Sequence, residues 1–280
     1  MKKWQKTLLT IALVLVLLVV MYPAYIAPKL LITNDLSAME GYAFAHRGYF
    51  NLTDAPENSL KSFQYAIDNG YGIELDVQLS SDGIPMVFHD ADLMRVCGVE
   101  GKIWDYTCAE LQQMKLFDSE EVIPTMAQAL ELIDGRTPLL VEYKMDKVDT
   151  AVCAQTQKLL DEYDGDYAIQ CFHPFALLWY EAKAPHVARG ILARDFVAEK
   201  IADGKEPSIL DFALSHMLFN FAMKPDFISY NFEDADHPAM QCVRLLGGKT
   251  ACWTLKSQEN YESVKDPFDM YIFDSFALEY

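Results

Sequence analysis

Residues 59–89 read SLKSFQYAIDNGYGIELDVQLSSDGIPMVFH and contain the pattern that predicts the fold. The segment begins with Ser59, a residue suited to cap a helix, and its helical pattern ends at Gly70. A strand-like apolar run follows at 72–76. A helix followed directly by a buried strand is the repeating unit of a parallel α/β sheet.

The same alternation extends over most of the chain. Strands are expected at residues 43–46, 72–76, 138–143, 167–172, 187–192, 226–230, 250–255 and 270–273. Helices are expected at residues 59–69, 125–133, 148–163, 174–183, 209–221, 238–246 and 258–264. Strands and helices in this order and number predict a closed (β/α)₈ TIM barrel, with a doubly wound open sheet as the alternative. In such a barrel the functional side chains lie at the C-terminal ends of the strands.

The second strand continues into a hairpin instead of a helix. Asp82-Gly83 stands between two alternating runs, which predicts an antiparallel hairpin with a two-residue turn. With that turn, Asp76 faces His89, and directly opposed residues have Cβ atoms about 4.5–5.5 Å apart. The barrel is therefore expected to carry a β-hairpin excursion after its second strand, which returns a histidine to the carboxylates.

Three acidic residues, Glu74, Asp76 and Glu142, lie in otherwise apolar strands. Buried charges are costly unless they are paired or bound to a metal. A salt bridge at the barrel rim would explain one pair, but it explains charges on several strands poorly. Three carboxylates offer hard oxygen ligands, which suit Ca²⁺ or Mg²⁺. Zinc, which His46 or His89 could also bind, fits this set less well.

Basic residues accompany these carboxylates at the strand ends. His46 and His89 could serve as an acid and a base, because imidazole titrates near neutral pH. Arg47 presents a planar fork suited to phosphate oxygens, and Lys144 adds a point charge on the side of Glu142. This combination favours phosphoester chemistry over glycoside hydrolysis, which requires two carboxylates flanking the bond.

The N-terminal residues differ in character from the rest. Three lysines, Lys2, Lys3 and Lys6, precede an uncharged run over 7–28, and about 20 apolar residues span a bilayer as a helix. The predicted organisation is a membrane anchor with a transmembrane helix at 1–28, a stalk at 29–40 and the barrel at 41–280. A cleaved signal peptide is the alternative. The lysines predict a cytoplasmic N-terminus and an extracellular barrel.

Composition limits the partners that the chain can bind. Of its 280 residues, 51% are hydrophobic and 23% are charged, which excludes a disordered protein and allows a large core. The formal charge of −18 would repel phosphate backbones and argues against nucleic acid as a partner. An anionic substrate therefore needs a local cationic site.

Several short motifs occur in a fixed order along the chain. They are His46-Arg47-Gly48, Pro56-Glu57-Asn58-Ser59, Glu74-x-Asp76-Val77, Asp82-Gly83-x-Pro85-x-Val87-x-His89-Asp90 and Glu142-x-Lys144. This set resembles the glycerophosphodiester phosphodiesterase family. The resemblance implies a barrel that hydrolyses a glycerophosphodiester to glycerol 3-phosphate and an alcohol. It also implies a divalent cation, Ca²⁺ or Mg²⁺, on Glu74, Asp76 and Glu142.

Roles for the remaining residues follow from the same resemblance. His46 and His89 would be the acid–base pair, and Arg47, with Lys144, would bind the substrate phosphate. Phe172 and Trp253 resemble later strand ends of the family and are candidates for the substrate wall.

Other functions stay open at this point. The same machinery could act on lysophospholipids or on a glycerol-phosphate envelope polymer, and a noncatalytic tethered binding module is a further alternative. The expected partners are the substrate and, through the N-terminal helix, a lipid bilayer, and the sequence names no protein partner.

Overall fold

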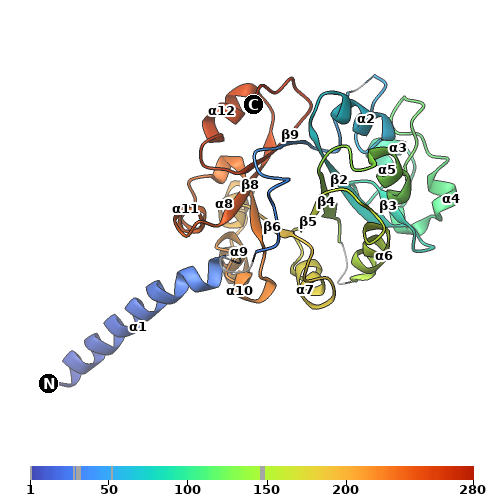
Figure 1. Ribbon diagram of the computed structural model, residues 1–280. Helices are drawn as coiled ribbons and strands as arrows, with labels where there is room; N and C mark the ends of the chain where they lie inside the picture. The colour runs from blue at the N-terminus through green and yellow to red at the C-terminus, as the bar shows by residue number, and fades with distance from the viewer. Residues whose placement is uncertain (1, 28, 30–32, 52, 146–148) are drawn as a thin grey trace.

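The computed structural model describes residues 2–27, 29, 33–51, 53–145 and 149–280. The expected anchor boundary at residue 28 and the expected helix start at residue 148 lie outside the described residues. Parallel strands form a closed barrel with helices around it (Figure 1). These strands are β1 Ala43–Ala45, β2 Gly72–Leu79, β4 Leu139–Tyr143, β5 Tyr167–Cys171, β6 Arg189–Ala193, β7 Phe227–Asn231, β8 Lys249–Leu255 and β9 Met270–Phe273.

Strand β1 closes the barrel, because it pairs in parallel with β9 on one side and with β2 on the other. A short strand β3, Pro85–Val87, pairs antiparallel with the outer end of β2. Each of the eight expected strands forms within a few residues of its predicted bounds. The closed barrel is therefore confirmed, and the open doubly wound sheet was wrong.

Helices follow the strands around the barrel. They are α2 Leu60–Asp68, α3 Met94–Cys97, η1 Ile103–Asp105, α4 Cys108–Leu111, α5 Met126–Ile133, α6 Ala151–Leu160, α7 Pro174–Lys183, α8 Phe196–Ala202, α9 Ile209–Ser215, α10 Asn220–Met223, η2 Phe232–Asp234, α11 Pro238–Leu245 and α12 Gln258–Val264. The Ser59 hydroxyl caps α2 as expected, since it accepts a hydrogen bond from the amide of Ser62. The single helix expected at 209–221 is divided into α9 and α10, because Met217 adopts a left-handed φ of 52°. Helix α8 was not expected.

The interior of the barrel is apolar at its N-terminal end. Phe44, Leu140 and Phe227 belong to one buried cluster there, and Leu36 and Met39 from the segment before β1 pack into the same cluster. The strands therefore rest on a filled core, and only their C-terminal ends are left for polar chemistry.

The hairpin after β2 forms with a register different from the predicted one. Val77 lies opposite Val87, and the amide of Phe88 donates to the carbonyl of Asp76 at 2.9 Å. Asp76 therefore faces Phe88, and the predicted pairing of Asp76 with His89 was wrong.

The length of the turn causes this shift. Ser80 and Ile84 close the turn through a 3.0 Å backbone hydrogen bond, so it contains three residues, 81–83, instead of two. Gly83 has a φ of 78°, the left-handed conformation that three-residue hairpin loops require at this place. His89 nevertheless lines the same pocket as Glu74 and Glu142.

Helix α1, Lys3–Ile26, extends away from the barrel (Figure 1). Its inner end is held by two hydrogen bonds: Tyr22 Oη lies 2.7 Å from His216 Nδ1, and Asn220 Nδ2 donates to the carbonyl of Ile26 at 2.8 Å. In the part of the chain that the structure describes, no helix is both long enough and apolar enough to cross a bilayer. The transmembrane helix expected here is therefore not supported.

Candidate active site

The side chains inside the barrel change character within two residues along a strand. On β4, Leu140 belongs to the apolar core, whereas Glu142 lies at the polar end. On β1 and just after it, Phe44 and His46 are related in the same way. Alternate residues of a strand point to the same face, so both members of each pair face the barrel interior.

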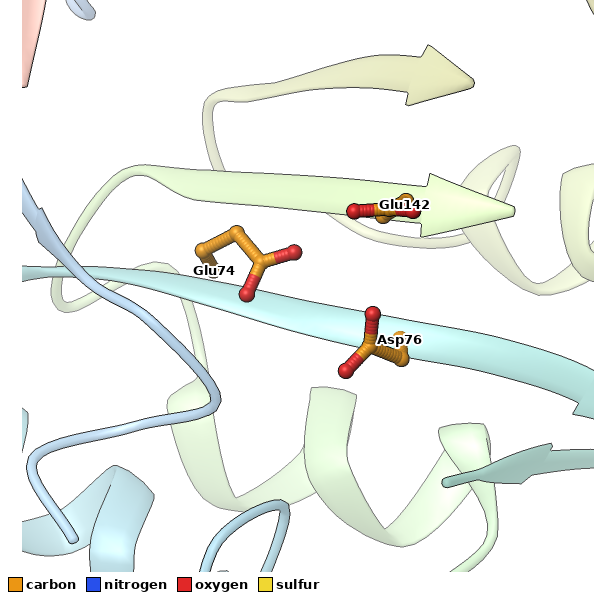
Figure 2. A group of neighbouring side chains, drawn as sticks. All are labelled: Glu74, Asp76 and Glu142. Atoms are coloured by element: carbon orange, nitrogen blue, oxygen red, sulfur yellow. The ribbon is translucent and has the colours of Figure 1, made fainter. Parts of the chain in front are cut away.

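Three buried carboxylates form the centre of the polar end (Figure 2). Glu74 and Asp76 come from β2, and Asp76 is the register partner of Glu142 on β4. One oxygen atom of each residue lies within 4.8 Å of the others. Burial, together with the charges of Asp76 and Glu142, raises the pKa of Glu74 well above its ordinary value of 4.5. Three such groups require positive charge to stay ionised together.

Two cations of the chain supply part of that charge. Lys144 Nζ lies 3.1 Å from Asp76 Oδ1 and also pairs with Glu142. Arg47 Nε lies 3.5 Å from Asp76 Oδ2, and the Arg47 amide donates to Glu74 Oε2 at 3.0 Å. Burial alone would raise the pKa of Asp76, but Lys144, His89 and Arg47 hold it below its ordinary value. Burial disfavours the charge on Lys144, yet the neighbouring carboxylates raise its pKa.

The carboxylates fit a divalent cation. The donor set contains only oxygen atoms, which hard cations such as Ca²⁺ and Mg²⁺ prefer. Glu74 Oε1 is buried and has no hydrogen-bond donor among the described side chains. A buried carboxylate oxygen without a partner is costly, and a bound cation would satisfy it. Which ion binds stays a prediction.

Both candidate acid–base histidines bond to a carboxylate. His46 Nδ1 lies 2.6 Å from Asp274 Oδ1, and His89 Nδ1 lies 2.6 Å from Asp90 Oδ1. A carboxylate only accepts hydrogen bonds, so Nδ1 carries the proton in both rings and Nε2 is free to exchange one. Burial lowers the pKa of His89, although Asp76 and Asp90 oppose this effect. Burial therefore favours the neutral form of the His89 imidazole.

Sequence reasoning did not assign the residues that hold these groups in place. Arg95 donates to both oxygens of Glu57, at 2.9 and 2.6 Å, and its Nε donates to Asp90 at 2.6 Å. Glu57 also accepts from Arg47 at 2.7 Å. One chain of ion pairs thus links Arg47 to the carboxylate behind His89. The motif around Glu57 was the available signal, but a motif does not show which partner each residue contacts.

Asn58 is a second such residue. Its side-chain amide donates to Asp76 Oδ2 at 2.8 Å, and its backbone adopts a left-handed φ of 56°. Asparagine tolerates that conformation better than most residues. Asn58 therefore orients one of the carboxylates, a role that the sequence could not separate from a helix start.

The pocket in front of these groups encloses about 200 Å³. Phe172 and Trp253 form part of its wall, with ring centroids 5.4 Å apart in an edge-to-face arrangement. Trp253 is fixed in place because its Nε1 donates to the carbonyl of Ser229 at 3.0 Å. Their positions suit the predicted substrate wall, and the role itself stays a prediction. His173, which follows β5, caps helix α7 by accepting a hydrogen bond from the amide of Phe175.

Solved structures define the class of protein to which this fold and site belong. A phosphodiesterase of Oleispira antarctica, solved with the product sn-glycerol-3-phosphate, is 26% identical and has a TM-score of 0.70 over 84% of this chain and 94% of that one. A glycerophosphodiester phosphodiesterase of Thermotoga maritima is 23% identical and shares the fold. Its TM-score is 0.65, over 83% of this chain and 94% of that one. The fold and the site together are those of a barrel phosphodiesterase.

The sequence gives the family. The model of the glycerophosphoryl diester phosphodiesterase family matches residues 46–272. The glycerophosphodiester phosphodiesterase of Bacillus altitudinis is 30% identical over 168 residues, which cover 55% of this chain and 67% of that protein. The chain belongs to this family and is a glycerophosphodiester phosphodiesterase, which excludes the noncatalytic binding module.

Proposed function

We propose that the enzyme hydrolyses a glycerophosphodiester to glycerol 3-phosphate and an alcohol, with a divalent cation and a pair of histidines. One observation carries this proposal: two members of a buried group of three carboxylates, Glu74 and Glu142, line a pocket together with two histidines. A further carboxylate holds each histidine through Nδ1. The Oleispira relative was solved with sn-glycerol-3-phosphate, which supports the same product here.

The reaction consumes one water molecule. The oxygen of the water forms a bond to phosphorus, and the bond between phosphorus and the oxygen of the alcohol breaks. One proton leaves the nucleophile, and one proton reaches the departing alcohol. A free hydroxyl of the substrate's glycerol is the alternative nucleophile, and the cyclic phosphate that it forms is then opened by water with the same overall balance.

The two histidines divide these proton transfers. Burial lowers the pKa of His89 and so favours its neutral form, which is the form that accepts a proton. We therefore assign proton acceptance to His89 Nε2 and proton donation to His46 Nε2. In this scheme Asp90 and Asp274 orient the rings and stabilise their charged forms.

Arg47 and Lys144 bind the nonbridging oxygens of the phosphate, since both line the pocket beside the carboxylates. A cation held by Glu74, Asp76 and Glu142 would supply Lewis-acid polarisation of a phosphoryl oxygen. These charges make the pocket attractive to an anion on a chain whose formal charge is −18.

The function is tested by the release of glycerol 3-phosphate from glycerophosphocholine by the full chain with Ca²⁺ or Mg²⁺. His46→Ala and His89→Ala should each lower turnover by about 10²–10⁴-fold, the usual contribution of acid–base catalysis. His186→Ala, at an exposed histidine remote from the pocket, is the matched control and should not change turnover. Release from neither glycerophosphocholine nor related diesters would refute the function.

A substrate with a p-nitrophenyl leaving group separates the two histidines. Nitrophenolate departs without a proton, so His46→Ala should recover most of its activity on this substrate, whereas His89→Ala should not. Equal recovery of both variants would contradict the assignment of roles.

We propose further that α1 attaches the enzyme to a lipid bilayer, with the N-terminus cytoplasmic and the barrel outside. The support is the uncharged sequence at 7–28 after three lysines, together with apolar side chains such as Leu13 and Val19, which are 68% and 72% exposed. The full chain should sediment with liposomes, and a variant with lysines at positions 13 and 19 should not. In cells, external protease should digest the barrel; complete protection would contradict the orientation.

A further inference from the structure

A large apolar groove opens beside the catalytic pocket. It encloses about 740 Å³, within the range of about 300–1,000 Å³ that is typical of ligand pockets. It lies between the loops that follow β5 and β6 and the helices α9 and α10. Its lining includes Phe172, Phe175, Leu178, Leu192, Leu210 and Phe219.

The groove is continuous with the catalytic pocket. Phe172, Leu192 and Arg194 line both spaces. The guanidinium of Arg194 lies 5.9 Å from the Phe172 ring centroid and pairs with Glu199 at 2.9 Å. Its buried Nε has no hydrogen-bond partner among the described residues. A ligand that begins at the carboxylates can therefore pass a polar donor and continue into an apolar space.

The outer edge of the groove is unusually exposed for its composition. Phe175, Leu178 and Leu210 are 45%, 37% and 54% exposed, and Phe219 is 38% exposed. Large contiguous apolar surfaces of this kind mark binding sites on soluble domains. The other spaces near the carboxylates are lined more by polar side chains, such as Gln78 and Lys144. Apolar character is thus confined to one side of the catalytic pocket.

The helices of the groove also hold α1. Tyr22 bonds to His216 at the end of α9, and Tyr25 packs edge-to-face on Phe221 of α10 at 5.2 Å. The backbone amide of Lys29 bonds to Pro225, before β7 begins. Helix α1 is therefore anchored on the same two helices, α9 and α10, that line the groove.

We propose that the groove binds the single acyl chain of a lysophospholipid, so that monoacyl glycerophosphodiesters are substrates. This inference rests on the proposed function. The headgroup phosphate would lie at the carboxylates, and the acyl chain would lie along Phe172 and Leu192. Water would then release the headgroup alcohol and leave an acylglycerol phosphate, with the same balance of bonds and protons as for a short diester.

A chain-length series tests this proposal with the full-length enzyme. The substrates are glycerophosphocholine and its 1-acyl derivatives from hexanoyl to dodecanoyl, used below their micelle-forming concentrations. The value of kcat/KM should rise with each added methylene, by up to about fourfold when the methylene is fully buried. In Leu210→Asp and Leu178→Asp this rise should flatten, while turnover of glycerophosphocholine should stay unchanged.

Ile209 provides a matched control, because it precedes Leu210 in the first turn of α9, is 89% exposed and does not line the groove. Ile209→Asp should keep the full chain-length dependence. Thermal unfolding of the three variants should show intact folds. Equal flattening by Ile209→Asp would show a nonspecific charge effect and would overturn the acyl site.

The outcomes separate the acyl site from the proposed function. Turnover of glycerophosphocholine without any gain from acyl chains would overturn the acyl site and leave the proposed function standing. If no diester is cleaved, the proposed function is refuted. Calorimetric titration of dodecanoyl glycerophosphocholine in EDTA then tests whether the groove binds the acyl chain. Binding that Leu210→Asp weakens and Ile209→Asp does not would support the acyl site, and absence of binding would overturn it.

Discussion

The two ends of the barrel are built from the same strands, yet they differ completely in chemistry. At the N-terminal end, Phe44 and Leu140 pack in a dry apolar cluster. Two residues further along the same strands, His46 and Glu142 face a pocket of charges. The apolar end gains stability from burial, whereas the polar end has buried carboxylates whose ionisation burial opposes.

This difference shows where the fold has room for function. Eight strands and their helices bury enough apolar surface at one end to tolerate an unfavourable charge cluster at the other. Removing side chains at the apolar end should therefore damage stability, and removing them at the polar end should damage activity. Substitutions at the two ends test this division.

The largest effect is expected from Glu142→Gln at the polar end. The amide keeps the size of the side chain but removes one anionic ligand for the cation and a partner of Lys144. Turnover should fall about a thousandfold or more, because Lewis-acid stabilisation supplies several kcal/mol. Steady-state kinetics at saturating Ca²⁺ measures this loss. Retention of full activity would remove Glu142 from the site.

Leu140→Ala is the counterpart at the apolar end. The free energy of unfolding should fall by about 2–5 kcal/mol, the usual cost of a large cavity in a core. Turnover per folded molecule should stay near that of the wild type. Urea unfolding and kinetics on the same sample measure both quantities. If Leu140→Ala lost activity while keeping its stability, the division between the two ends would be wrong.

Protonation of Glu74 gives a smaller effect on stability. The pKa of Glu74 in the folded protein lies above 4.5, its ordinary value, so the folded state keeps a proton that the unfolded state loses. Without a cation, the stability of the protein should therefore fall as pH rises above 4.5. Glu74→Gln should remove this slope, and Glu259→Gln, at an exposed carboxylate on α12, should not. An unchanged slope in Glu74→Gln would contradict the assignment.

A bound cation should oppose the same loss of stability. It would compensate the repulsion among Glu74, Asp76 and Glu142, and at about a hundred times its Kd it should add about 2.7 kcal/mol to the free energy of unfolding. Urea unfolding at neutral pH with Ca²⁺ or with EDTA measures the gain. Equal stability in both conditions would argue against binding at this site.

The smallest effect is expected from Asp90→Asn. Asp90 raises the pKa of His89 against the larger effect of burial, so its neutralisation should lower that pKa further. If His89 accepts a proton, the acid limb of kcat/KM should move to lower pH. Asp274→Asn, next to His46, should leave the acid limb in place. A shift toward higher pH in Asp90→Asn would reverse the role given to His89.

The sequence predicts the barrel because its signals are local. Apolar runs and helix caps such as Ser59 depend on neighbouring residues, and the strand order follows from the alternation. The predicted hairpin register was wrong because Asp82-Gly83 fits both a two-residue and a three-residue turn. Only the backbone hydrogen bond between Ser80 and Ile84 decides between the two turns. The break between α9 and α10 depends on the conformation of Met217, which no local pattern indicated.

The main residues of the candidate site could also be predicted from the sequence, but their supporting contacts could not. The carboxylates and histidines lie where strand ends converge, so position in the fold brings them together. Their supporting contacts are long-range: Asp274 reaches His46 from the last strand, and Arg95 joins Glu57 to Asp90. The apolar groove depends on how α7, α9 and α10 pack together, which the helices expected at 174–183 and 209–221 do not reveal by themselves. Such contacts require the three-dimensional arrangement.

Cation-dependent release of glycerol 3-phosphate tests the mechanism most directly. The full chain is stripped with EDTA, and turnover of glycerophosphocholine is measured as Ca²⁺ or Mg²⁺ is added back, with Glu142→Gln beside the wild type. Turnover should be absent in EDTA, should appear with the cation in the wild type, and should stay about a thousandfold lower in the variant. Equal release of glycerol 3-phosphate with and without the cation would contradict the mechanism.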